Sequence, residues 1–312
     1  MWFRQAKFYQ LSNKLDGPES LSDLLSDFAF EPCPPSFAIT QGWIGPIYHE
    51  GGEPLVHHIP GYLLFCLQFE EKILPMTVVR QAVKEKIREI EINEDRKVRT
   101  KEKQQLNEEI RHSLLPKAFS KFSRVHAMID VKQQLLIVNT TQEKKLESFL
   151  TLFHRSIKNI EAKNIAFKSI MPILTSWLMN NNHPNSLIIE KNAVLQDPNY
   201  QQRVVRCQQQ DLSAKSIQTL LSEGCAVKQL TLSWQQQIAF ALHDDLTLRS
   251  IKYQDELIEA AKEINAESDA QRFDANFLIM AESLHNLTRE LLPYFAEIQP
   301  STAKNPTEEV VA

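Results

Sequence analysis

Residues 111–140 read RHSLLPKAFSKFSRVHAMIDVKQQLLIVNT. Leu114 completes the apolar stripe of a helix, and Pro116 ends that helix because proline cannot continue the hydrogen-bond ladder. Segments 125–130 and 135–140 are apolar, and the polar residues 132–134 between them predict a β-hairpin turn. A helix that leads directly into an antiparallel hairpin is typical of the α+β class.

Both flanks of this stretch carry further helices and strands. Upstream, Pro75 begins a helical tract that runs to about Leu115, with a break near residues 93–100. The other expected helices are 20–28, capped by Ser20, and 142–158, 213–223 and about 268–292. The expected strands are 2–11, 37–43, 62–69, 203–209, 227–234, 237–243 and 246–252.

The predicted fold is therefore α+β, with mostly antiparallel sheets, segregated helices and no repeat of fixed period. We expect residues 1–296 to form a single structured region with several subregions. These are a basic helical and hairpin region at about 75–140, a mixed α+β region at about 160–252 and an acidic C-terminal helix at about 253–296. Residues 297–312 are predicted to be a disordered tail.

Charge is distributed unevenly along the chain. The 312 residues have a formal net charge of −4, from 35 Lys and Arg and 39 Asp and Glu. Residues 253–312 contain 4 basic and 12 acidic residues, which leaves 31 and 27 for the rest, so the body is positive and the C-terminal segment strongly negative. A polyanionic partner would therefore bind the body of the chain.

The four cysteines, at positions 33, 66, 207 and 225, form no paired metal or redox motif. No apolar stretch has the length of a signal sequence or of a membrane span. These observations predict a cytoplasmic protein that needs no cofactor.

The helix expected at 77–91 carries Arg80, Lys84 and Arg88 on one narrow arc. Like charges at this spacing repel one another, and a polyanion would offset the repulsion. The arc is interpreted either as a solvated helix face or as a set of phosphate contacts.

The strongest basic run follows at residues 96–124, where the only acids are Glu102, Glu108 and Glu109. Phosphate binding needs several modest cations, each of which releases counterions from DNA. A solubilising surface remains the alternative. The cations of this run are Arg96, Lys97, Arg99, Lys101, Lys103, Arg111, Lys117, Lys121 and Arg124.

Two aromatic residues, Phe119 and Phe122, lie inside the basic run. Three roles remain open for them: packing in the core, contact with a second subunit, or stacking on the bases of a single strand.

Signs of an enzyme are few. The chain has 7 glycines, and none forms a phosphate-binding loop or a nucleophile elbow. Glu53, Glu70 and Lys72 loosely resemble a metal-dependent nuclease core. The adjacent pair His57-His58 would point to opposite faces of a strand, and Asp244-Asp245 is interpreted as a turn. We therefore expect no catalytic residues and no metal site, and keep the nuclease as an alternative.

Several sequence strings resemble the recombination-associated RdgC family. The most specific is HSLLPKAFSKFS at residues 112–123. Supporting strings are EEKILP at 70–75, DL at 211–212, WQQ at 234–236 and AQRFDA at 270–275. The similarity runs from Trp2 to about residue 295.

This resemblance implies a horseshoe-shaped protomer that closes with a second copy into a ring dimer around duplex DNA. It also implies sequence-nonspecific DNA binding, possible binding of single strands, antagonism of RecA-type recombinase and association with the nucleoid. By position, it assigns Lys72, Arg96 and Lys117 to the DNA passage and Phe119 to the subunit contact. Gln210 falls where the family has a polar residue facing the hole.

The sequence departs from the family pattern just before this position. Residues 207–210 read CQQQ where lysine-type residues are expected. Fewer cations there would lower the affinity for DNA or shift the contacts onto residues 96–124.

A third function class is a protein-interaction scaffold that uses the acidic C-terminal helix. It predicts no retardation of DNA at low salt, whereas a nuclease predicts cleaved DNA and an encircling protein predicts retarded, intact DNA.

Overall fold

The computed structural model describes residues 1–15, 17–47, 54–200, 202–263 and 268–295, except for the side chains of residues 262 and 263. Glu53 and the tail at 297–312 therefore lie outside the described residues. The chain divides into two compact units, Tyr9–Lys163 and Met1–Phe8 with Asn164–Ala312. We call them the N-terminal and the C-terminal unit.

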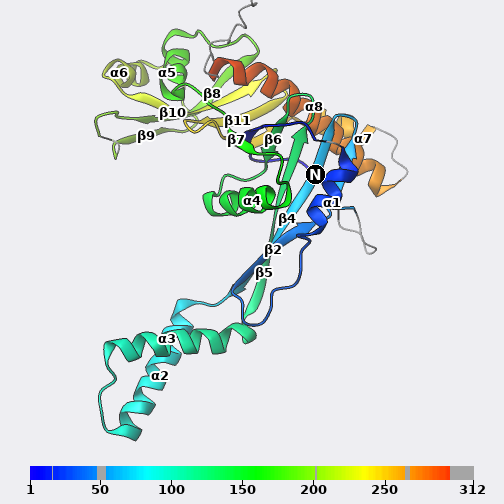
Figure 1. Cartoon of the computed structure of the whole chain (residues 1–312). Coiled ribbons are helices and arrows are strands. Elements are labelled where there is room, and N and C mark those ends of the chain that lie inside the picture. The colour runs from blue at the N-terminus through cyan, green and yellow to red at the C-terminus, as the bar shows by residue number, and fades with distance from the viewer. Residues whose placement is uncertain (16, 48–53, 201, 264–267, 296–312) are drawn as a thin grey trace, which may run out of the picture. The chain divides into compact units, whose positions relative to one another are not determined.

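The N-terminal unit is built on a seven-stranded sheet together with helices (Figure 1). Its elements are β1 (Lys7–Leu11), α1 (Pro18–Ser26), β2 (Ile39–Ile44), β3 (Val56–Ile59), β4 (Tyr62–Ile73), α2 (Met76–Glu94), α3 (Thr100–Leu114), the 3-10 turn η1 (Leu115–Lys117), β5 (Phe119–Asp130), β6 (Leu135–Val138), α4 (Glu143–Ser156) and β7 (Ala162–Asn164), and the boundary between the units passes through β1 and β7. The strand order is β2-β4-β5-β6-β1-β7, and β3 pairs with β4.

The C-terminal unit contains a five-stranded antiparallel sheet with the order β12-β11-β10-β8-β9. Its elements are α5 (Ile170–Asn180), β8 (Leu187–Gln196), β9 (Val204–Cys207), α6 (Lys215–Ser222), β10 (Ala226–Trp234), β11 (Ile238–His243), β12 (Leu248–Tyr253), α7 (Asp255–Glu263) and α8 (Asp269–Phe295).

Aromatic side chains fill the core of the N-terminal unit. The rings of Phe65, Phe149 and Phe153 stack on one another, and Trp43 meets two of them edge to face. The buried indole N–H of Trp43 donates a hydrogen bond to Ser156 Oγ at 2.9 Å, so its polar atom is satisfied. These contacts fasten α4 to the sheet.

Glycine is needed at position 42 because another backbone passes directly over β2. A Cβ atom at Gly42 would lie 2.4 Å from the Cα atom of Phe30. The close approach allows the N–H of Phe30 to donate to the carbonyl of Trp43 at 2.9 Å.

The predicted α+β class is confirmed, and so are its antiparallel sheets. The helical tract from Pro75 breaks where expected, because Asp95 adopts a left-handed conformation after α2. The predicted hairpin is also present, and the carboxylate of Asp130 accepts the N–H groups of Lys132 and Gln133 in its turn. The turn at Asp244-Asp245 is confirmed as well.

Other expectations were wrong in detail. Ser20 lies inside α1, which begins after Gly17, so Ser20 does not cap the helix. The first strand begins at Lys7 rather than at residue 2. The acidic C-terminal region forms two helices, α7 and α8, rather than one. Among the described residues, no helix combines the length and the apolar character that a membrane span requires.

Candidate nucleic-acid interface

The basic residues predicted for DNA binding lie on α2, in the loop between α2 and α3, on α3, on η1 and on β5, and Lys72 lies on β4. Strands β4 and β5 pair without interruption from Tyr62 opposite Asp130 to Ile73 opposite Phe119. Figure 1 shows the two helices beyond this last pair. A small apolar core joins the helices, and its buried members are Val79, Val83, Val98, Leu106 and Leu115. The remaining helix surface is therefore left to polar and charged side chains.

The arc of Arg80, Lys84 and Arg88 is exposed along α2, as expected for residues spaced by four. Within the described part of the chain, these three side chains form no hydrogen bond or ion pair. The four acids of the same helix, Glu85, Glu89, Glu91 and Glu94, bond to other groups. The arc therefore forms no ion pair with the acids of its own helix.

Most cations of residues 96–124 are also exposed and, in the ranges that the structure describes, unpaired. These side chains are Lys97, Arg99, Lys101, Lys103, Arg111, Lys117 and Lys121. Together with the arc on α2 they form a series of exposed cations without ion pairs among the described residues, and residues 80–121 hold 12 Lys and Arg against 8 Asp and Glu. Such a surface attracts a polyanion and releases its counterions.

Arg96 has a different environment from its neighbours. Its guanidinium donates to Glu94 at 2.6 Å and to both oxygens of Glu102 at 2.7 and 2.6 Å. These hydrogen bonds raise the pKa of Arg96 and lower the pKa of Glu102. Arg96 thus links the end of α2 to the first turn of α3, and a phosphate would have to replace these carboxylates.

Arg124 and Gln210 are two further predicted DNA contacts. Arg124 is exposed and donates through Nε to Gln68 Oε1 at 3.1 Å, across from β5 to β4. Gln210 is exposed after β9, where its N–H donates to the carbonyl of Lys191 at 3.0 Å. Gln210 belongs to the C-terminal unit, whereas the other predicted DNA contacts belong to the N-terminal unit.

Lys72 belongs to a largely buried polar cluster at the pairing of β4 with β5. Its Nζ atom donates to Ser120 Oγ at 3.0 Å and lies 3.7 Å from Glu70 Oε1. Glu70 also accepts from Ser120 Oγ at 2.6 Å and from the N–H of Cys33 at 2.7 Å. The Lys72 side chain is only 12% exposed, so it can present little of its charge to a phosphate.

The cluster also includes two of the three residues of the nuclease alternative, Glu70 and Lys72. The hydrogen bonds from Ser120 and from Cys33 hold the pKa of Glu70 below its usual value, so the carboxylate is ionised and fully engaged. Across the described residues, no three His, Cys, Asp or Glu side chains are grouped so that they could hold a metal ion. Glu70 and Lys72 are therefore arranged as a structural pair at the sheet.

Phe119 and Phe122 are surface residues, 84% and 56% exposed, so the core-packing alternative is wrong for both. Because three positions separate them on one strand, they point to opposite faces of the β4–β5 pair. Phe119 lies opposite Ile73, which is 49% exposed, and Phe122 lies opposite Glu70. One flat contact can therefore bury only one of the two rings.

Sequence reasoning missed the residues that share a face with Phe119. Exposed Ile39 lies opposite Glu71, and Glu71 in turn lies opposite Lys121. Apolar and charged residues alternate at positions 69–73, and this pattern in the sequence indicates that the strand continues to residue 73. The partner strand was expected to begin only at Val125, so the sequence did not indicate that Phe119 lies on the same face.

The chain is similar to known proteins over almost its whole length. The sequence profile described as "Putative exonuclease, RdgC" matches residues 1–298. The recombination-associated protein RdgC of Sodalis glossinidius (strain morsitans) is 34% identical over 294 residues, which cover 94% of this chain and 96% of that protein. The protein of the same name from Aeromonas hydrophila is 34% identical over 286 residues, 91% of this chain and 94% of its own.

A third similar protein is the recombination-associated protein RdgC of Yersinia enterocolitica. It is 32% identical over 298 residues, which cover 94% of this chain and 97% of that protein. Its identity and coverage are close to those of the other two relatives. The chain therefore belongs to the RdgC family.

Proposed function

We propose that this protein binds duplex DNA without sequence preference, through the cations of α2, of α3 and the loop before it, of η1 and of the start of β5. The observation that carries the proposal is the series of exposed cations from Arg80 to Lys121, most of which form no ion pair in the described part of the chain. Lys and Arg on a helical surface contact phosphates, which are the same for every sequence. The family membership supports DNA as the polyanion.

The proposed active form is a homodimer that encircles the duplex. The exposed face of Phe119, Ile73 and Ile39 supports this form, because a large apolar group on the surface favours a partner. A two-fold contact would bring this apolar face against the same face of the second copy.

The proposed cellular role is modulation of recombination by antagonism of a RecA-type recombinase, in association with the nucleoid. The names of the relatives, which call them recombination-associated, support this role. Physically, a protein that occupies DNA phosphates excludes a filament from the same stretch. No direct contact with the recombinase is needed for this effect.

The proposal is tested by incubating end-labelled duplex with the full-length protein at low salt, with and without Mg²⁺. We expect retarded bands that release full-length DNA after the protein is removed. Mg²⁺-dependent shortening of the label would support the nuclease alternative, in keeping with the exonuclease description of the family profile. A failure to retard DNA at low salt would favour the scaffold role and contradict DNA binding.

A further inference from the structure

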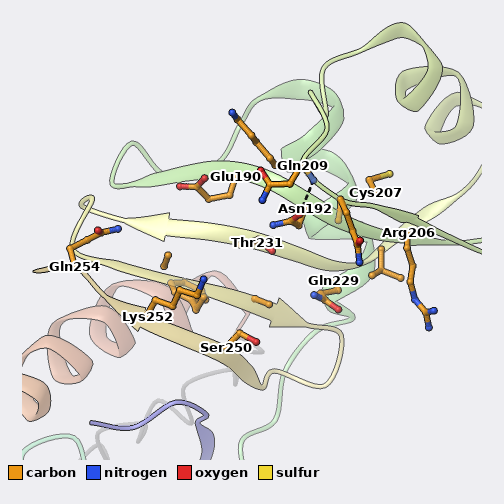
Figure 2. A pocket seen from close by; sticks show the side chains of 17 residues that line it. Glu190, Asn192, Arg206, Cys207, Gln209, Gln229, Thr231, Ser250, Lys252 and Gln254 are labelled. Atoms are coloured by element: carbon orange, nitrogen blue, oxygen red, sulfur yellow. Dashed lines mark hydrogen bonds between the residues drawn. The ribbon is translucent and has the colours of Figure 1, made fainter.

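Two hollows among the described residues differ in their lining. The larger, of about 740 Å³, lies over strands β8 to β12, and Figure 2 shows charged and amide side chains along it. The other, of about 410 Å³, belongs to the N-terminal unit and is lined by α1, by the end of α4 and by the segment after β1. We call this second hollow the α1–α4 hollow. Its lining combines apolar side chains with cations.

Five apolar side chains line the α1–α4 hollow. They are Leu15, Leu24, Phe28, Ile157 and Ile160. Ile157 and Ile160 belong to the core of the N-terminal unit, and Leu15 and Phe28 pack against that core. Leu24 is 40% exposed, so part of this apolar surface is open to solvent. A ligand that covers it would gain free energy from its burial.

Cations line the same hollow. They are Lys14, Arg155 and Lys158, all of them exposed. In the part of the chain that the structure describes, none of the three forms an ion pair. Asp27 is the only acid among the described residues of the lining, since Glu19 and Asp23 of α1 do not line the hollow. Three cations and one acid leave the lining with a formal charge of +2.

Hydrogen bonds tie together the two segments that carry the lysines. The N–H of Ser12 donates to the carbonyl of Glu161 at 3.0 Å, and the N–H of Glu161 donates to Ser12 Oγ at 3.0 Å. The side-chain amide of Asn13 donates to the carbonyl of Asn159 at 2.8 Å. The segment after β1 is therefore fixed beside the segment after α4 without the help of a ligand.

Arg155 is placed by an aromatic ring. Its guanidinium carbon lies 5.2 Å from the centroid of the Phe28 ring, in a cation–π contact. A guanidinium stacked in this way can still donate from its edge to both oxygens of a carboxylate. The same contact covers one face of Phe28, so this face is not available for stacking on a nucleic-acid base.

An apolar surface bordered by cations suits an acidic peptide better than a nucleic acid. A phosphodiester backbone would satisfy the cations, but it has no apolar group to cover Leu24. A peptide supplies both, because its carboxylates pair with the cations while an apolar side chain is buried beside them. The volume also falls within the range of about 300–1,000 Å³ that is usual for pockets that bind small ligands. The hollow therefore has room for a short segment rather than for a folded domain.

We infer that the α1–α4 hollow binds a short acidic segment of a partner protein. An apolar side chain of the segment packs against Leu24, and its carboxylates pair with Lys14, Arg155 and Lys158. The inference goes beyond the proposed function, since none of these residues is among the proposed DNA contacts. The partner and the duplex use different side chains, so the same protein can bind both.

The probe is a fluorescein-labelled hexapeptide of alternating aspartate and leucine, and its anisotropy is measured with the full-length protein. K14A/K158A should weaken its binding about fivefold, the effect expected when two exposed ion pairs are lost. L24S should weaken it by a similar factor, because a partly buried leucine contact is lost. Both variants should bind duplex DNA as the wild type does.

Matched controls remove the same kinds of side chain elsewhere in the N-terminal unit. Lys132 and Lys144 are exposed and lie outside the hollow, so K132A/K144A is the control for charge. Ile92 is exposed on α2, so I92S is the control for an apolar side chain. Neither control should weaken peptide binding, and circular dichroism should show that all four variants are folded.

A photo-cross-linking residue at position 24 locates the bound probe. We expect a cross-link to the acidic peptide and none to peptides of alternating lysine and leucine or of alternating aspartate and serine. The inference is wrong if the acidic peptide does not bind, if both hollow variants bind it as tightly as the wild type, or if the lysine peptide binds in its place. A cross-link from position 24 to duplex DNA would also overturn it and assign the hollow to nucleic acid. A wild-type protein that binds the peptide but no duplex would contradict only the proposed function.

Discussion

Reversing one charge on η1 and one at the start of β5 should weaken DNA binding by about two orders of magnitude or more at 0.1 M salt. At this salt concentration, each phosphate left without its cation lowers the affinity nearly tenfold. The variant is K117E/K121E. Both lysines are exposed and, in the described part of the chain, unpaired, so the variant removes no native ion pair. The measurement is fluorescence anisotropy of a labelled duplex, and the salt slope should fall by about 0.9 for each of these phosphates.

The control must carry the same change in net charge. Lys144 on α4 and Lys158 after it are exposed in the same unit and belong to neither α2, α3, η1 nor β5, so K144E/K158E serves this purpose. Glu71 lies opposite Lys121, so a neutral variant, K117Q/K121Q, removes the new like-charge pair and should still bind weakly. If the folded K117E/K121E variant bound DNA with wild-type affinity, these lysines would not be part of the DNA interface.

The second large effect concerns release from closed circular DNA. Phe119 is 84% exposed, and leaving such a ring in water forgoes about 2–3 kcal/mol of burial. In a two-fold contact this loss of burial occurs twice. The variant F119S should therefore open the proposed ring and speed dissociation from a circular plasmid by more than about tenfold, since an open protomer pair lets the duplex leave sideways.

The dissociation rate is measured after the addition of excess competitor DNA. Ile92 on α2 is 79% exposed, so I92S controls for the removal of an exposed apolar side chain. F122S tests whether the contact also covers the opposite face of the β4–β5 pair. Equal rates for wild type and F119S, with the variant folded and binding linear DNA normally, would exclude Phe119 from ring closure.

Local signals in the sequence were sufficient to predict many of the helix and strand boundaries. Pro75 and Pro116 delimit the helical tract because proline suits a first turn and prevents continuation. Pro172 is a misleading signal, because a proline normally marks the boundary of a helix and this one lies within α5. It lies in the first turn of α5, where its missing N–H has no helical partner to lose.

The candidate site was less predictable because the hydrogen-bond and ion-pair partners of each side chain depend on the fold. The density of cations at residues 96–124 is visible in the sequence. That Arg96 is held by Glu94 and Glu102, while Lys97 is unpaired among the described residues, follows from the way α2 and α3 meet. The hollow over strands β8 to β12 could not be predicted either, since its residues come from strands far apart in sequence and only the register brings them together.

The most direct test of the central claim is the affinity of the full-length protein for several unrelated duplexes of equal length, measured across a salt series. The account predicts nearly equal affinities for all sequences and a steep, linear fall of log affinity with log salt, because phosphates are contacted and bases are not. A strong preference for one sequence, or an affinity that does not change with salt, would contradict it.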